Sequence, residues 1–173
     1  MVATKVSLQT EDLNDIKSAI HKSLRESLSR LRRESVDVFQ LHSQIALKRG
    51  PSQRTLEMED VLGVGGVADA FDEAKSKGLI RYCGFTGLGD TEALHQINDS
   101  GRFDVVQSYY NLLNPSAGLH APTGFAGHDF RLLISKASEK KMGIVVIRVL
   151  AGGALGGRSR PPRLCLACTR IIN

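Results

Sequence analysis

Val36-Asp-Val-Phe-Gln-Leu41, followed directly by His42, shows most clearly a pattern that recurs along this chain. The stretch is too short for a helix and is rich in β-branched and aromatic residues, so it predicts a β-strand. Similar short runs occur at several other places along the chain. The predicted strands cover residues 2–6, 36–41, 80–85, 104–107 and 143–147.

Helices are predicted between these strands. From Ile16 to Leu31, apolar residues recur every three or four positions among charged and polar ones, which indicates an amphipathic helix. We expect Thr10 or Asp12 to cap its first turn, and Gly78 to end the next helix. Strands that alternate with helices imply parallel pairing, so the fold class is α/β: either a doubly wound sheet or part of a (β/α)8 barrel. The remaining predicted helices cover residues 67–77, 91–98 and 128–141.

Two glycine-rich stretches bear on the choice between these folds. Residues 63–66 precede a predicted helix and residues 152–157 follow a predicted strand. Neither matches the dinucleotide-binding fingerprint or the phosphate loop that ends in Gly-Lys-Ser/Thr. This mismatch weakens the doubly wound, nucleotide-binding alternative.

Charge is unevenly distributed along the chain. The 23 Lys and Arg exceed the 18 Asp and Glu, which gives a net charge of +5. Because residues 1–142 are neutral in total, a basic face that binds nucleic acid is not supported there. We expect residues 156–173, which lack a hydrophobic period, to be a basic tail that is disordered or foreign to the fold. The excess positive charges are Arg148, Arg158, Arg160, Arg163 and Arg170.

No membrane span is predicted. The longest apolar run, residues 143–155, is interrupted by Arg148 and falls short of the roughly 20 apolar residues that a membrane helix needs. Residues 1–10 lack the pattern of a secretory signal, so a cytoplasmic location is expected.

The three cysteines do not indicate a disulfide scaffold, because their number is odd and Cys83 falls in a predicted strand. Cys165 and Cys168 have the spacing of a metal or redox pair. That pair stands alone, without a second pair or a following helix signal, so we expect no metal site.

Polar side chains stand at the carboxyl ends of the predicted strands. In a closed parallel barrel these ends converge on one mouth, where catalytic groups lie. Strand alternation places His42 on one face with Val38 and Gln40, opposite Phe39 and Leu41, and its ring could donate a hydrogen bond to a substrate oxygen. The strand-end residues are Lys5, His42, Thr86, Gln107 with Asn111, and Arg148.

Four ordered blocks now point to a family. Residues 37–42, 78–86, 104–114 and 143–153 resemble, in order and spacing, the middle of an aldo-keto reductase. The resemblance spans about residues 2–155. It implies a (β/α)8 barrel that binds a nicotinamide cofactor, usually NADPH, across its carboxyl-end mouth. Residues 1–155 would then form an incomplete barrel domain, strands three to seven with the intervening helices, because a full barrel needs about 250 residues.

The resemblance also assigns the catalytic positions. Lys5 takes the place of the family's catalytic lysine, and His42 that of the histidine that orients the carbonyl. Thr86 stands where a serine holds the nicotinamide carboxamide, and Gly87 replaces the asparagine that usually follows it. Gln107 takes the place of a glutamine that contacts the same carboxamide.

The block at residues 143–153 departs further from the family. In an alignment to the family without gaps, Ile147 falls near the position of the aromatic that stacks on the nicotinamide. A shift of one residue puts Arg148 at that position instead, where a planar guanidinium could replace the aromatic face. Leu150 and the glycines after it would line the pyrophosphate path.

The family's proton-donating tyrosine and its aspartate come from the first two β/α units, which lie outside this match. Loss of a positioned acid removes about 100- to 10,000-fold in rate, so we expect negligible turnover from this chain alone. The parent reaction is the NAD(P)H-dependent reduction of an aldehyde, ketone or sugar carbonyl. We expect a small-molecule carbonyl or sugar substrate, no nucleic acid, no membrane, and association through exposed sheet edges.

Two alternatives stay open. The chain could be a non-catalytic nucleotide-binding or regulatory module derived from the same barrel. It could also be an independent, flavodoxin-like α/β domain that only resembles the family.

Overall fold

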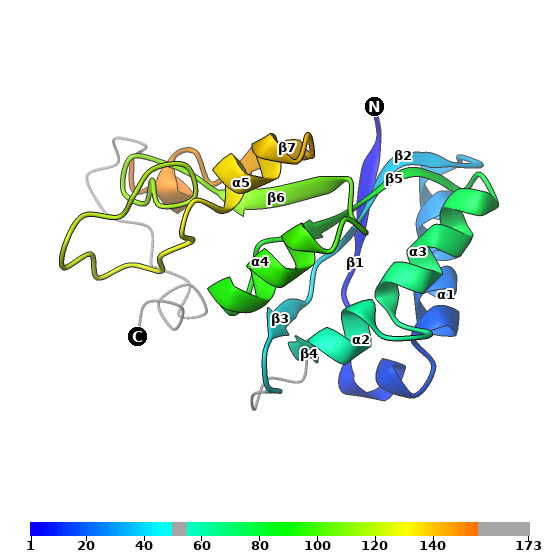
Figure 1. The fold of residues 1–173 in the computed structure, drawn as a ribbon. Helices are drawn as coiled ribbons and strands as arrows, with labels where there is room; N and C mark the ends of the chain where they lie inside the picture. The colour runs from blue at the N-terminus through cyan, green and yellow to red at the C-terminus, as the bar shows by residue number, and fades with distance from the viewer. Residues whose placement is uncertain (50–54, 156–173) are drawn as a thin grey trace. The chain divides into compact units, whose positions relative to one another are not determined.

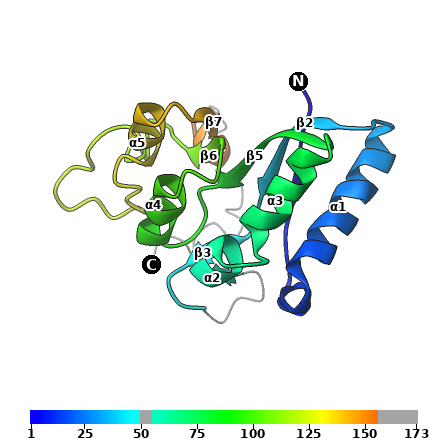
Figure 2. The same ribbon diagram turned by 45° about the vertical axis from the view of Figure 1, so that its right-hand side comes forward.

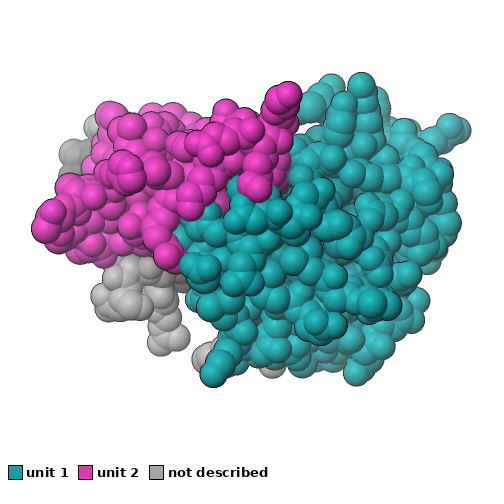
Figure 3. Space-filling model, viewed as in Figure 1, with its two compact units in different colours: residues 1–106 teal, residues 107–173 magenta. Residues whose placement is uncertain are grey.

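The structure is a computed structural model that describes residues 1–49 and 55–155. The chain divides into two compact units, unit 1 at Met1–Val106 and unit 2 at Gln107–Asn173 (Figure 3). The expected basic tail at residues 156–173 lies outside the described residues, and the single domain over residues 1–155 stays a prediction.

Helices separate the strands of the main sheet along the chain (Figure 1). Unit 1 contains β1 (Ala3–Val6), η1 (Thr10–Asn14), α1 (Ile16–Leu31), β2 (Val36–Leu41), β3 (Gln44–Ala46), β4 (Thr55–Glu57), α2 (Met58–Leu62), α3 (Val67–Ser76), β5 (Ile80–Thr86) and α4 (Thr91–Asp99). The strand β6 (Val105–Tyr109) begins at the end of unit 1, and α5 (Leu133–Glu139), β7 (Gly143–Ile147) and η2 (Ala151–Gly153) follow in unit 2.

The strands form a five-stranded sheet in the order β1-β2-β5-β6-β7, which does not close into a barrel among the described residues. β1 pairs with β2 and β2 with β5, both in parallel. The sheet is therefore the α/β, partial-barrel arrangement that the sequence predicts, and no reversal interrupts the order of its strands.

Two faces of the sheet in unit 1 are distinguished by their side chains. The ring of Phe39 on β2 packs 5.3 Å from that of Phe71 on α3, and Phe85 on β5 packs 5.5 Å from Phe103. Helices α1 and α3 lie side by side over this face (Figure 2). Because side chains alternate along a strand, Gln40 points to the opposite face, as the sequence predicts.

The helix α1 begins later than its predicted caps. Asp15 caps it, and its carboxylate accepts a hydrogen bond from the Ser18 backbone N–H at 3.0 Å. That hydrogen bonding to Ser18 lowers the pKa of the Asp15 carboxyl. The prediction of Thr10 or Asp12 as the cap was wrong, since both residues belong to the short 3-10 helix η1.

The connection between β2 and α3 contains structure that the sequence did not predict. β3 and β4 form a separate two-stranded parallel sheet, and α2 follows β4. Ile45 on β3 also bonds to the loop after β5: its N–H donates to the Leu88 carbonyl at 2.9 Å and its carbonyl accepts from the Asp90 N–H at 2.8 Å. The segments that follow β2 and β5 are therefore joined through their backbones.

In unit 2, the helix α5 starts at Leu133. The sequence predicts a start near residue 128, which is too early. The N–H groups of residues before it bond to an earlier loop: the Phe130 N–H donates to the Ser116 hydroxyl at 3.0 Å, and the Leu132 N–H donates to the Ser116 carbonyl at 2.9 Å. Arg131 and Leu132 both adopt positive φ, at 47° and 65°. These bonds explain the shorter helix.

No helix within residues 1–49 and 55–155 is long and apolar enough to cross a membrane. Within the same ranges, no group of three or more His, Cys, Asp or Glu side chains could hold a metal ion. Cys165 and Cys168 lie outside those ranges.

Candidate active site at the carboxyl ends of the strands

His42 and Thr86 meet where β2 and β5 end. Leu41 and Phe85, the residues just before them, are register partners in the parallel pair. The His42 N–H donates to the Val6 carbonyl at 2.7 Å, which ties the end of β2 to the end of β1. His42 Nδ1 then lies 3.0 Å from Thr86 Oγ1, within hydrogen-bonding distance. The sheet thus brings together two residues that are 44 positions apart.

Lys5 lies on the same face of the sheet as His42. The neighbouring Thr4 turns its hydroxyl toward Ser27 of α1, at 3.5 Å, so Lys5 points away from the helices. In the register of β1 and β2, Lys5 is the partner of Gln40, two residues before His42. Partial burial lowers the pKa of the Lys5 ammonium below its usual value.

Gln40 is a polar residue of this face that the sequence analysis did not single out. Its side chain is 2% exposed, and its Nε2 has no acceptor within the described part of the chain. Gly84 on β5 makes room for it: a Cβ at residue 84 would lie 3.2 Å from Gln40 Cγ and 2.7 Å from the Val105 carbonyl oxygen. The signal that could have found Gln40 is its strand parity with His42.

Unit 2 holds the other predicted site residues. Gln107 is buried on β6, and alternation places Tyr109 on its face of that strand. The Arg148 guanidinium carbon lies 4.5 Å from the centre of the Tyr109 ring, and the Asn111 side-chain amide donates to the Arg148 carbonyl at 3.0 Å. Leu150 is 59% exposed. In this structure, therefore, Arg148 stacks on Tyr109, and Tyr109 was missed by sequence reasoning.

The candidate residues accordingly fall into two groups. Lys5, His42 and Thr86 belong to unit 1, and the structure brings His42 and Thr86 into direct contact. Gln107, Arg148 and Leu150 belong to unit 2. The roles of all six stay predictions.

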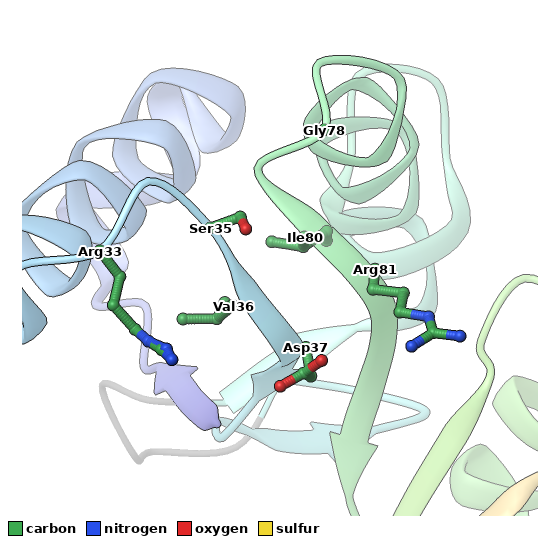
Figure 4. Close-up of a pocket in the computed structure, with 7 residues that line it drawn as sticks. All are labelled: Arg33, Ser35, Val36, Asp37, Gly78, Ile80 and Arg81. Atoms are coloured by element: carbon green, nitrogen blue, oxygen red, sulfur yellow. The ribbon is translucent and has the colours of Figure 1, made fainter. Parts of the chain in front are cut away.

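A cavity of about 490 Å³ lies at the other end of the same strands. Ser35 and Val36 contribute from the start of β2, and Gly78 and Ile80 from the start of β5. Figure 4 shows the arginines of this cavity on opposite sides of Asp37. None of the predicted site residues contributes to it. The lining residues are Arg33, Ser35, Val36, Asp37, Gly78, Ile80 and Arg81.

Cys83, in the middle of β5, is fully buried. Burial raises the pKa of its thiol to about 11. Because the thiolate is the nucleophilic form, Cys83 is a structural residue and not a reactive one.

Comparison with known proteins now identifies the family. The model of the aldo/keto reductase family matches residues 1–164, nearly the whole chain. The chain belongs to the aldo/keto reductase family. No curated protein gives a significant match.

Solved structures of the same family share the fold. An aldo-keto reductase from Bacillus halodurans, AKR11C1 in its holo form, aligns with a TM-score of 0.61 at 21% identity, over 95% of this chain and 45% of that one. The Bombyx mori aldo-keto reductase AKR2E4, in complex with NADP, aligns with a TM-score of 0.60 at 14% identity, over 94% and 46% of the two chains. This chain therefore spans less than half the length of these relatives.

Proposed function

We propose that this chain carries the carbonyl-orienting and nicotinamide-holding portion of an NADPH-dependent reductase that acts on an aldehyde, ketone or sugar carbonyl. Membership of the family supports the parent reaction. The observation that carries the proposal is the 3.0 Å contact between His42 Nδ1 and Thr86 Oγ1 at the carboxyl ends of two parallel strands, where sites form in such folds.

His42 would orient the substrate in this proposal. Its imidazole is partly exposed, unlike Thr86 beside it, so the ring is accessible to a ligand. A ring N–H that donates to a carbonyl oxygen fixes the substrate and stabilises negative charge that develops on that oxygen.

The family resemblance assigns two of these side chains to the nicotinamide carboxamide. A carboxamide offers two N–H donors and one carbonyl acceptor. Thr86 supplies a buried hydroxyl, and Gln107 supplies a buried amide, each able to donate and to accept. NADPH, when bound, supplies the hydride. The relative from Bombyx mori is in complex with NADP, which supports this cofactor for the family. The other proposed contacts are Arg148, against the nicotinamide ring, and Leu150, along the pyrophosphate path.

Lys5 would act on the reaction electrostatically. An ammonium near a phenol favours the phenolate and so lowers the phenol's pKa. Tyr82, a tyrosine of unit 1, lies four residues before Thr86 on the same strand, about 13 Å away at the usual rise of a strand. Tyr82 is therefore no candidate for the proton donor. Because the family's proton-donating tyrosine comes from the first two β/α units, we propose that this chain alone turns over carbonyl substrates negligibly.

Titration with NADPH tests the binding part of the proposal. The chain contains no Trp, so the emission of the reduced nicotinamide itself is the signal. We expect saturable enhancement with the natural chain and weaker binding by Thr86→Val and Gln107→Leu. Thr123→Val, on an exposed loop residue, is the matched control.

A second experiment separates a reductase from a binding module. The first two β/α units of the Bacillus halodurans reductase, where the family resemblance places the tyrosine and the aspartate, are fused ahead of residue 1, and aldehyde reduction is measured. Restored turnover supports the reductase. NADPH binding by a folded fusion without turnover supports the non-catalytic module, and no NADPH binding by either protein contradicts the proposal.

The expected association through sheet edges is also a proposal. β1 and β7 are the outermost strands in the order of the described sheet, and Ile144 and Val146 on β7 are 38% and 37% exposed. Exposed strand edges and apolar side chains favour self-association. Sedimentation velocity at increasing concentration should reveal it, and Val146→Lys should reduce it.

A further inference from the structure

The contact between His42 and Thr86 has two chemically different forms. Either the Thr86 hydroxyl donates its hydrogen to Nδ1, or the ring carries a hydrogen on Nδ1 and donates it to the hydroxyl oxygen. In the first form the neutral ring has its hydrogen on Nε2. In the second form, a neutral ring has none there. The two forms therefore differ in whether Nε2 can donate a hydrogen bond.

Burial distinguishes the two forms. Thr86 is 1% exposed, and within residues 1–49 and 55–155 its hydroxyl is paired with His42 Nδ1. If the ring were the donor, the hydroxyl hydrogen would be buried without an acceptor in that part of the chain, which is unfavourable. If the hydroxyl is the donor, its hydrogen is satisfied. A hydroxyl oxygen tolerates a missing donor better, since it is also able to accept from a ligand.

Threonine suits this role through its shape. The β-branch restricts rotation about χ1, so the hydroxyl is held in one position relative to the strand. The Thr86 carbonyl is occupied by the Leu88 N–H at 2.7 Å, which fixes the backbone just beyond the side chain.

We propose that Thr86 is a positioning residue for His42: its hydroxyl donates to Nδ1 and thereby holds the ring in the tautomer with the hydrogen on Nε2. This inference rests on the proposed function, in which Nε2 donates to a carbonyl oxygen. The lone pairs of the same hydroxyl can accept from a carboxamide N–H, and a hydroxyl that donates and accepts together makes both bonds stronger. Nicotinamide binding and the histidine tautomer are then coupled through one oxygen atom.

The tautomer can be measured without activity. In the ¹⁵N-labelled full chain, at a pH where the ring is neutral, long-range ¹H–¹⁵N correlation distinguishes a protonated ring nitrogen from an unprotonated one. His42→Asn assigns the signals among the five histidines. We expect His42 to show one tautomer, with unprotonated Nδ1 and protonated Nε2. Thr86→Val should give a mixture of both tautomers, whereas Thr86→Ser should keep the single one.

A hydrogen on Nδ1 in the natural chain would overturn the inference, and so would a Thr86→Val variant with unchanged tautomer populations. If Thr86→Val does not fold, the natural chain and Thr86→Ser still decide. The outcomes can be told apart. NADPH that fails to bind while Nε2 carries the hydrogen contradicts only the proposed function. NADPH that binds while Nδ1 carries the hydrogen contradicts this inference and the Nε2 donation by His42, but not the proposed NADPH binding.

Discussion

The two ends of the strand pair β2 and β5 differ in the burial and hydrogen bonding of their polar side chains. At the amino end, Asp37 is only half-buried, and its carboxylate accepts the Val2 N–H at 2.7 Å. At the carboxyl end, Thr86 is fully buried against His42, and Gln40 keeps a buried Nε2 without an acceptor in the described chain. Buried polar groups that are incompletely satisfied destabilise a fold. The unsatisfied amide of Gln40 at the carboxyl end supports the proposal that a ligand binds there.

The largest effect is expected from a substitution at the carboxyl end. In the fusion that carries the tyrosine and aspartate, His42→Asn should lower kcat/KM by about 100-fold or more, because the shorter Asn side chain has no donor at the position of the ring Nε2. Steady-state reduction of an aldehyde measures the effect. His120→Asn, on an exposed loop residue, should leave the rate unchanged. Equal losses in both variants would show that His42 has no special role.

Cys83 lies in the middle of β5, between the two ends, and should make the stability of the fold depend on pH. The Cys83 thiol has a pKa of about 11 when folded, against 9.0 for an unperturbed thiol. Between pH 9 and 11 the folded chain keeps this proton while the unfolded chain loses it, so stability falls as pH rises, by on the order of 2 kcal/mol.

Urea unfolding of the natural chain and of Cys83→Ala checks this pH effect. As pH rises from 8 to 10.5, the unfolding free energy of the natural chain should fall relative to that of Cys83→Ala. A difference that does not change with pH would mean that burial of Cys83 leaves its ionisation unaltered.

Gln40→Leu removes the unsatisfied amide from the carboxyl end. The variant should be more stable by about 1 kcal/mol, because a buried polar atom is replaced by an apolar group of similar size. Gln44 provides the control, since its side-chain oxygen accepts the Thr55 hydroxyl at 3.3 Å. Gln44→Leu should therefore not stabilise the chain. Thermal unfolding of both variants measures the difference, and a destabilised Gln40→Leu would refute this interpretation of Gln40.

The smallest effect is expected at the amino end. Asp37→Asn weakens the acceptor of the Val2 N–H and should lower stability by about 0.5 kcal/mol. NADPH affinity should not change, because this end lies away from His42 and Thr86. Glu34→Gln, on the exposed neighbouring turn, is the control. If Asp37→Asn lost NADPH binding and Glu34→Gln did not, the ligand would bind at the amino end of the strands, which contradicts the proposed site.

The strands were predictable because each carries a dense local signal. Val36–Leu41 and Gly143–Ile147 were predicted with their observed bounds. β3 and β4 were not, because three-residue strands contain too few side chains to show alternation. The start of α5 depends on bonds to Ser116, a contact between distant residues that no local pattern contains.

The site was predictable only in part, for the same reason. Strand-end position and family resemblance pointed to His42 and Thr86, and the structure puts them in contact. The burial of Gln40 and the stacking of Arg148 on Tyr109 depend on neighbouring strands. Such contacts arise only from the assembled sheet.

The backbone bonds of Ile45 have a consequence for engineering. They join the segment after His42 to the segment after Thr86, and the Leu47 N–H adds a third bond, to the Asp90 carboxylate at 3.0 Å. Grafting a foreign loop onto either segment alone would leave its former partner's amides and carbonyls unmatched. A redesign of this edge of the sheet would have to replace both segments together.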